Sequence, residues 1–174
     1  MSELAMHVLI DQTGHPGIDA QHQQLSLLVA DLNDICADAE RAVGDCPHCP
    51  EAYREICIDR LAGLIGELLG FMVEHFRYEE NLMRLLPSTP EALRHIREHK
   101  RAHAEVSTQL SALTFSLDEG DPLACAHRLQ KVVEHWLGAH GQSHDQRLVG
   151  ALEAAFGHEV DYDLELVRLM VDAA

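Results

Sequence analysis

The sequence is poor in basic residues. Lys and Arg together number 13 against 29 Asp and Glu, so the 174-residue chain carries a formal net charge of −16. Nucleic acids and anionic lipid surfaces are bound by clustered Lys and Arg. We therefore expect neither nucleic acid nor a membrane as a partner.

Long apolar runs are missing as well. No stretch approaches the roughly 18–20 apolar residues that a membrane-spanning helix requires. The first residues, MSELAMHVLIDQTGH, show no basic segment followed by an apolar one, which is the pattern of a secretory signal. We therefore expect a cytoplasmic protein without a transmembrane span.

The chain also lacks the even number of cysteines that is typical of a disulfide scaffold. It has five cysteines, and disulfides are rare in a reducing compartment. Cys46 and Cys49 form a CPHC sequence in a loop marked by Gly and Pro, which suits zinc binding or a redox-active dithiol. No second cysteine pair follows, so a plain surface loop is the favoured interpretation.

Strand-like alternation is absent, and helical patterns cover nearly the whole chain. Apolar residues at 3–4 spacing predict helices over about 19–41, 50–85, 90–117 and 122–140, with shorter stretches at 147–156 and 161–172. Four long helices with short connections predict an all-α, up-down antiparallel four-helix bundle. We expect one domain over 1–174, with a core at about 18–145 and a short C-terminal helical extension, 146–174.

Prolines and capping residues mark the helix boundaries. Pro50 suits the start of the second helix. Ser88 or Thr89 can cap the third helix, and Asp121 the fourth, each ahead of a proline. The buried side of the second helix is predicted to carry Ile56, Leu61, Ile65, Leu68 and Met72.

Histidine, in contrast, is abundant. The 13 histidines equal Lys and Arg combined, and histidine is the commonest metal ligand among side chains. Every predicted long helix carries histidine near the same end of the bundle: His22, His75, the series His95, His99 and His103, and His140. An up-down topology places these groups at one level, as a metal site in a bundle core requires.

The third helix offers a choice of histidines. Residues at equal height in an antiparallel hairpin have position numbers with a nearly constant sum, about 174–176 for a turn centred near 87–88. His75 with His99, and Glu79 with His95, fit that sum. We therefore favour His95 and His99 over the pair that includes His103, which is left as an outer partner or an exchange ligand.

The expected ligands are five imidazoles and two carboxylates: His22, His75, Glu79, His95, His99, His140 and Asp145. This set exceeds what one tetrahedral zinc can use, whereas mixed nitrogen and oxygen ligands suit a pair of iron ions. His140 and Asp145 are five residues apart, which does not place them on one face of an α-helix. Gly138 and Gly141 would let the helix loosen there and bring Asp145 back.

Four ordered motifs resemble those of the hemerythrin family, specifically the bacterial hemerythrins. They are IDAQH (18–22), HFRYEENLM (75–83), HIREH (95–99) and WLGAHGQSHD (136–145). The resemblance covers about 18–145. It implies two non-haem iron ions that share an oxo or hydroxo bridge, and reversible binding of O₂.

The resemblance also implies a division of the ligands. His95, His99 and His140 would complete one iron, and His22 and His75 would leave the other an open position for O₂. Glu79 and Asp145 would bridge the two ions.

The sequence departs from the family pattern at Gly141, where a bulky aliphatic residue is usual. The interval between His22 and His75, which holds the CPHC loop, is also longer than usual. The leading hypothesis is an O₂-binding protein that carries, stores or senses oxygen rather than an enzyme. The alternatives are a di-iron peroxidase or nitric oxide-handling enzyme, a redox- or oxygen-responsive interaction module that uses Cys46 and Cys49, and a metal-free structural bundle. The oligomeric state is left open.

Overall fold

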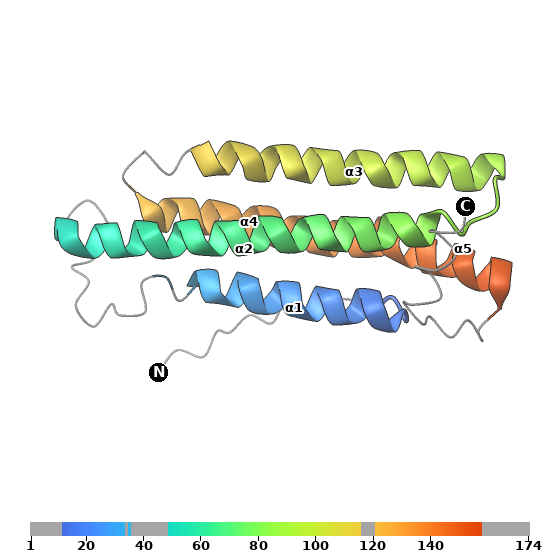
Figure 1. Cartoon of the computed structure of the whole chain (residues 1–174), viewed down its shortest axis with the longest axis horizontal. Coiled ribbons are helices and arrows are strands. Elements are labelled where there is room, and N and C mark those ends of the chain that lie inside the picture. Colours follow the sequence, from blue (N-terminus) through green and yellow to red (C-terminus); the bar gives the residue numbers. More distant parts are fainter. Residues whose placement is uncertain (1–11, 34, 36–48, 116–120, 158–174) are drawn as a thin grey trace.

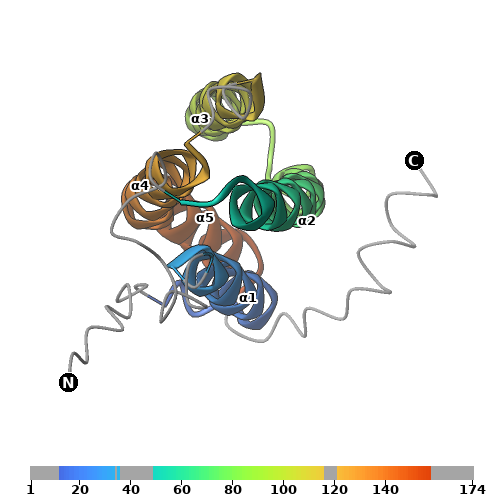
Figure 2. The same cartoon turned by 90° about the vertical axis from the view of Figure 1, so that its left-hand side faces the viewer.

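The protein is an all-α, up-down antiparallel four-helix bundle, as predicted. The computed structural model describes residues 12–33, 35, 49–115 and 121–157, and within these ranges it contains no strand. The helices are α1 (Pro16–Asn33), α2 (Glu51–Met83), α3 (Pro90–Thr114), α4 (Pro122–His140) and α5 (Gln146–Phe156), with a π-helical turn at Gly141–Asp145. Figure 1 shows α5 continuing the line of α4, and Figure 2 shows α1, α2, α3 and α4 arranged around the bundle axis.

Capping residues set two of the helix starts as the sequence predicts. The side chain of Thr89, rather than Ser88, accepts a hydrogen bond from the backbone N–H of Ala92 at 3.2 Å. Asp121 accepts one from Ala124 at 3.0 Å. Each satisfies a backbone donor that a helix start leaves open, and a proline follows each cap at the first helical position.

The first helix begins earlier than the predicted start near Asp19. The His15 imidazole takes the capping role, since its Nδ1 lies 3.2 Å and 3.4 Å from the backbone N–H groups of Gly17 and Ile18. Asp19 instead accepts hydrogen bonds from Thr13, at 2.8 Å from both its backbone N and its Oγ1. The predicted end of this helix, near residue 41, lies outside the described residues, as do the CPHC cysteine Cys46 and the stretch 161–172.

The predicted buried side of α2 is correct except at its beginning. Leu61, Ile65, Leu68 and Met72 are buried, but Ile56 is 62% exposed. Figure 1 shows the reason, because the first turns of α2 extend beyond the ends of α1 and α3. Periodicity assigns a face to each residue but not the height at which neighbouring helices begin.

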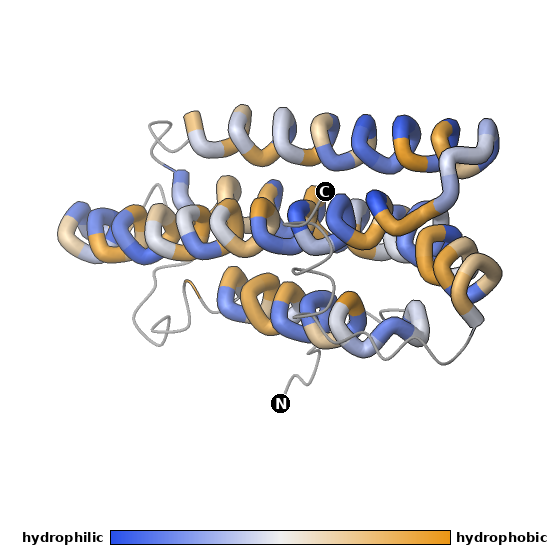
Figure 3. The backbone as a smooth tube through the Cα atoms, turned by 45° about the vertical axis from the view of Figure 1, so that its right-hand side comes forward, coloured by the Kyte–Doolittle hydropathy of each residue, from blue (hydrophilic) through white to orange (hydrophobic). Residues whose placement is uncertain are grey.

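The bundle interior has two apolar clusters. The larger one includes Leu25, Leu68, Val106 and Leu129, and the smaller one is built around Ile18, Leu82, Leu148 and other residues near the α2–α3 turn. Figure 3 shows the alternation of apolar and polar positions along each helix that produces this interior. Between the clusters, the four helices contribute buried histidines and carboxylates at one level.

No helix of the described ranges combines the length and apolarity needed to cross a membrane.

Helix α5 ends at Phe156. The next residue, Gly157, has a φ of 81°, a conformation that residues with a Cβ rarely adopt.

Candidate metal centre

Seven buried side chains converge between the two apolar clusters. They form two groups that share Glu79, each with ligand-type atoms within 4.8 Å of one another. The first group is Glu79, His99, His103 and His140, and the second is His22, His75, Glu79 and Asp145. Six of the seven predicted residues are thus brought together, with His103 as the additional member.

Both carboxylates lie between the two groups of histidines. Glu79 Oε2 is 2.9 Å from His103 Nε2 and 3.3 Å from His99 Nε2, whereas its Oε1 is 3.4 Å from His75 Nε2. One oxygen of Glu79 therefore faces each of the two sets of histidines. Asp145 is placed in the same way.

Asp145 Oδ1 is 3.2 Å from His99 Nε2 and 3.1 Å from His140 Nε2. Its Oδ2 is 3.2 Å from His22 Nε2. The two carboxylates thus divide the five histidines into a set of three, His99, His103 and His140, and a set of two, His22 and His75.

A π-helical turn brings Asp145 onto the face of His140. Residues Gly141–Asp145 form this turn, whose hydrogen bonds run from residue i to i+5. A spacing of five then stacks the two side chains, which a regular α-helix does not do. The expected loosening of the helix near Gly141 is therefore present, as a defined turn rather than an irregular break.

His103 occupies the place that the hairpin arithmetic gives to His95. His95 lies in neither group, although it is buried and its ring centroid is 5.4 Å from that of His99. The prediction for this position is not supported. Side chains on a helix tilt toward its N-terminus, which is away from the turn on α2 and toward the turn on α3. Both tilts move the residues that Glu79 contacts further along α3, from His95 to His99 at 3.3 Å and His103 at 2.9 Å.

A sequence signal for His103 does exist. The buried residues of α3 are Ala92, His95, His99, His103, Val106 and Leu110. Their spacing of three or four residues is that of one helix face, and His103 lies within it.

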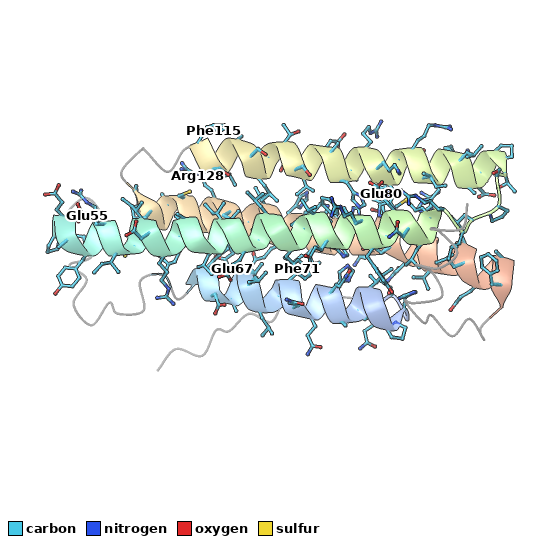
Figure 4. All side chains as sticks on the ribbon, viewed as in Figure 1. Glu55, Glu67, Phe71, Glu80, Phe115 and Arg128 are labelled. Carbon is cyan, nitrogen blue, oxygen red and sulfur yellow. The ribbon has the colours of Figure 1, made fainter. Side chains whose placement is uncertain are left out.

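Two further residues lie on the outer sides of the histidines. His75 Nδ1 lies 2.9 Å from Gln21 Oε1; because an amide oxygen only accepts, Nδ1 carries the proton and Nε2 presents its lone pair to the centre. Glu80 Oε1 lies 3.8 Å from His103 Nδ1, and its Oε2 is 2.6 Å from Lys100 Nζ. Figure 4 shows Glu80 between α2 and α3. Sequence reasoning missed both residues, although Gln21 and Glu80 directly adjoin predicted ligands.

Burial sets the protonation of the centre. It lowers the pKa of His75 to about 3, with the neighbouring His22 adding to the effect, and that of His99 to about 4. The pKa of His103 falls to about 2 for the same reason. These imidazoles are therefore neutral at physiological pH, which is the form that binds metals.

The two carboxylates differ in their electrostatics. Burial, followed by the proximity of Asp145, raises the pKa of Glu79 well above its usual value. Burial alone would also raise the pKa of Asp145, but the imidazoles of His140, His22 and His99 outweigh it and hold that pKa well below its usual value.

The donor set fits bound cations. Among the described residues, several buried atoms that face the centre lack a hydrogen-bond partner, including His22 Nε2, His75 Nε2, Glu79 Oε1 and both oxygens of Asp145. Buried polar atoms without partners are costly. Cations bound between the carboxylates would satisfy all of these lone pairs at once.

The fold and this cluster define a metal-binding four-helix bundle. Comparison with protein families agrees, because the model of the hemerythrin HHE cation binding domain matches residues 13–152. The chain belongs to the hemerythrin family. Neither the curated proteins nor the solved structures gave a match.

Proposed function

We propose that the chain holds two iron ions at this centre and binds O₂ reversibly at one of them, for oxygen storage or sensing. The division of the ligands carries this proposal. Three histidines lie on one side and two on the other, with one oxygen of each carboxylate directed to each side. Such a set suits two ions of which one is fully ligated by protein and one is open.

In this proposal His99, His103 and His140 would hold the ion at the closed position, and His22 and His75 would hold the ion at the open one. Glu79 and Asp145 would each offer one oxygen atom to each position. His103 replaces the earlier choice of His95, because only His103 approaches Glu79 and His140, at 2.9 Å and 3.2 Å.

Aromatic rings lie beside both sets of histidines. The ring centroid of Phe71 lies 6.2 Å from that of His75. Phe76 and Trp136 lie 5.9 and 5.7 Å from His75, and 4.0 and 4.6 Å from His103 and His140. These apolar surroundings suit a small apolar ligand such as O₂. When bound, two ferrous ions would supply the two electrons that reversible O₂ binding requires, and His22 and His75 would hold the ion at the open position.

The test is anaerobic reduction of the iron-loaded protein followed by titration with O₂. We expect about two iron ions per chain and a visible absorption band that appears with O₂ and disappears when O₂ is removed. Fewer than about one iron per chain in protein purified without chelator would refute the metal centre. Iron-loaded protein that shows no reversible band would refute the proposed O₂ binding but not the metal centre.

A second candidate is an enzyme that consumes peroxide or nitric oxide, and one feature favours it. Gly141 is buried beside the open position, where an added Cβ would lie 3.8 Å from His22 Cε1 and 3.9 Å from Asp145 Oδ2. With no side chain there, the open position has less cover than a bulky residue would give. Catalytic turnover of peroxide or nitric oxide with a reductant would separate this enzyme from a carrier.

A further inference from the structure

The centre is sealed less completely on the side of α3 and α4. His75, Glu79, His99 and Asp145 are fully buried, whereas His103 and His140 retain slight exposure. A groove of about 170 Å³ lies on the α3/α4 side, and its wall includes the proposed ligand His140. The groove therefore brings solvent to a proposed ligand of the closed position.

The groove is lined by groups that attract cations. Glu105, His135 and His144 contribute to its wall, and none of its lining residues is Lys or Arg. The overall charge of the chain, −16, adds to this preference.

His144 is part of the groove wall. Its ring centroid is 5.0 Å from that of His99 and 5.0 Å from that of His140, yet it belongs to neither ligand group. The residue is only half-buried. It thus contacts both the groove and two proposed ligands of the closed position.

His95 lies behind His144. Its ring centroid is 6.3 Å from that of His144, and the side chain is 4% exposed. Neither of its ring nitrogens has a hydrogen-bond partner among the residues that the structure describes. A buried imidazole without partners is unfavourable, and a cation bound next to His144 would supply the missing interaction.

We propose that His144, with His95, is a transient binding position for divalent metal ions that enter through the α3/α4 groove and pass to His99 and His140. The exchange needs only the neutral imidazoles, because each transfer replaces one nitrogen ligand by another without a change in oxidation state. This inference rests on the proposed metal centre, and it assigns a role to two histidines that the centre does not use.

The experiment measures how fast the metal-free protein takes up Co²⁺, whose visible absorption reports ligation, in a stopped-flow instrument. We compare the wild-type chain with H144Q, H95Q and H127Q. His127 is an exposed histidine of α4 outside the groove, and its variant serves as the matched control. Circular dichroism verifies that each variant is folded.

We expect H144Q to load about tenfold more slowly than the wild-type chain, H95Q to slow in the same direction, and H127Q to match wild type. All four proteins should reach the same final content of two Co²⁺. Loading of H144Q within about twofold of wild type would overturn the proposal, and so would a lower final content, which would make His144 a permanent ligand. Failure of the wild-type chain to bind Co²⁺ would instead refute the metal centre itself.

Discussion

Replacement of His103 and of His95 by Gln provides the sharpest test of the ligand assignment. The two histidines lie two turns apart on α3, and each is 4% exposed. The cost of burying the new amide is therefore similar in H103Q and H95Q. What differs is their geometry toward the centre.

His103 has the geometry of a direct ligand. Its Nε2 lies 2.9 Å from Glu79 Oε2 and 3.2 Å from His140 Nε2. Two ligands that each lie about 2.1 Å from one ion, at angles between a right angle and the tetrahedral angle, are roughly 3.0–3.4 Å apart. His95 makes no such approach to either carboxylate, and it lies outside both ligand groups.

The expected magnitude follows from this difference. Loss of an outer partner of a metal ligand costs about 10–100-fold in affinity, so loss of a direct ligand should cost at least about 100-fold, or ~2.8 kcal/mol. We expect H103Q to lose iron to a competing chelator at about 100-fold lower chelator concentration. H95Q should stay within about threefold of wild type at equilibrium, because no ligand is removed.

The assay is chelator competition at equilibrium, with iron per chain measured by elemental analysis. Unfolding of the metal-free variants by denaturant shows whether the two substitutions are matched in stability. If H95Q loses iron as readily as H103Q, or H103Q retains both ions, the placement of His103 in the centre is wrong.

Three further predictions concern the surroundings of the centre. Gln21→Ala removes the acceptor that fixes His75 and should weaken metal binding about 10–100-fold, whereas Gln23→Ala, an exposed neighbour, should leave chelator competition unchanged. The metal-free protein should lose stability as the pH falls below 6.5, because burial lowers the pKa of His75 and His99 in the folded state to about 3 and about 4 and the unfolded chain takes up protons first. Each of these two histidines then lowers the free energy of unfolding by up to ~1.4 kcal/mol for each pH unit. Glu79, whose pKa is raised in the folded state, partly offsets this loss. Equal denaturation midpoints at pH 7 and pH 5 would contradict the prediction. Gly141→Leu should slow the air oxidation of the reduced centre and Gly141→Ala should do so less, since the added Cβ points toward His22 and Asp145; oxidation rates that do not change would show that this position does not cover the open site.

The sequence by itself determined the helices and the approximate level of the site. Threonine and aspartate caps with a following proline, as at Thr89 and Asp121, act within one turn, and apolar spacing fixes which face is buried. The motifs at His22, His75 and His140 then meet because antiparallel helices reverse direction at short turns. None of these conclusions requires knowledge of how far one helix slides along another.

Tertiary structure decided the details that depend on side-chain direction and on packing between helices. His103 rather than His95 reaches Glu79, because side chains tilt along their helices in opposite directions across the hairpin. Asp145 reaches His140 through a π-helical turn, and a histidine caps α1. The sequence therefore provides the candidate residues for the seven-residue cluster, and the relative register of α2 and α3 determines which of them come together.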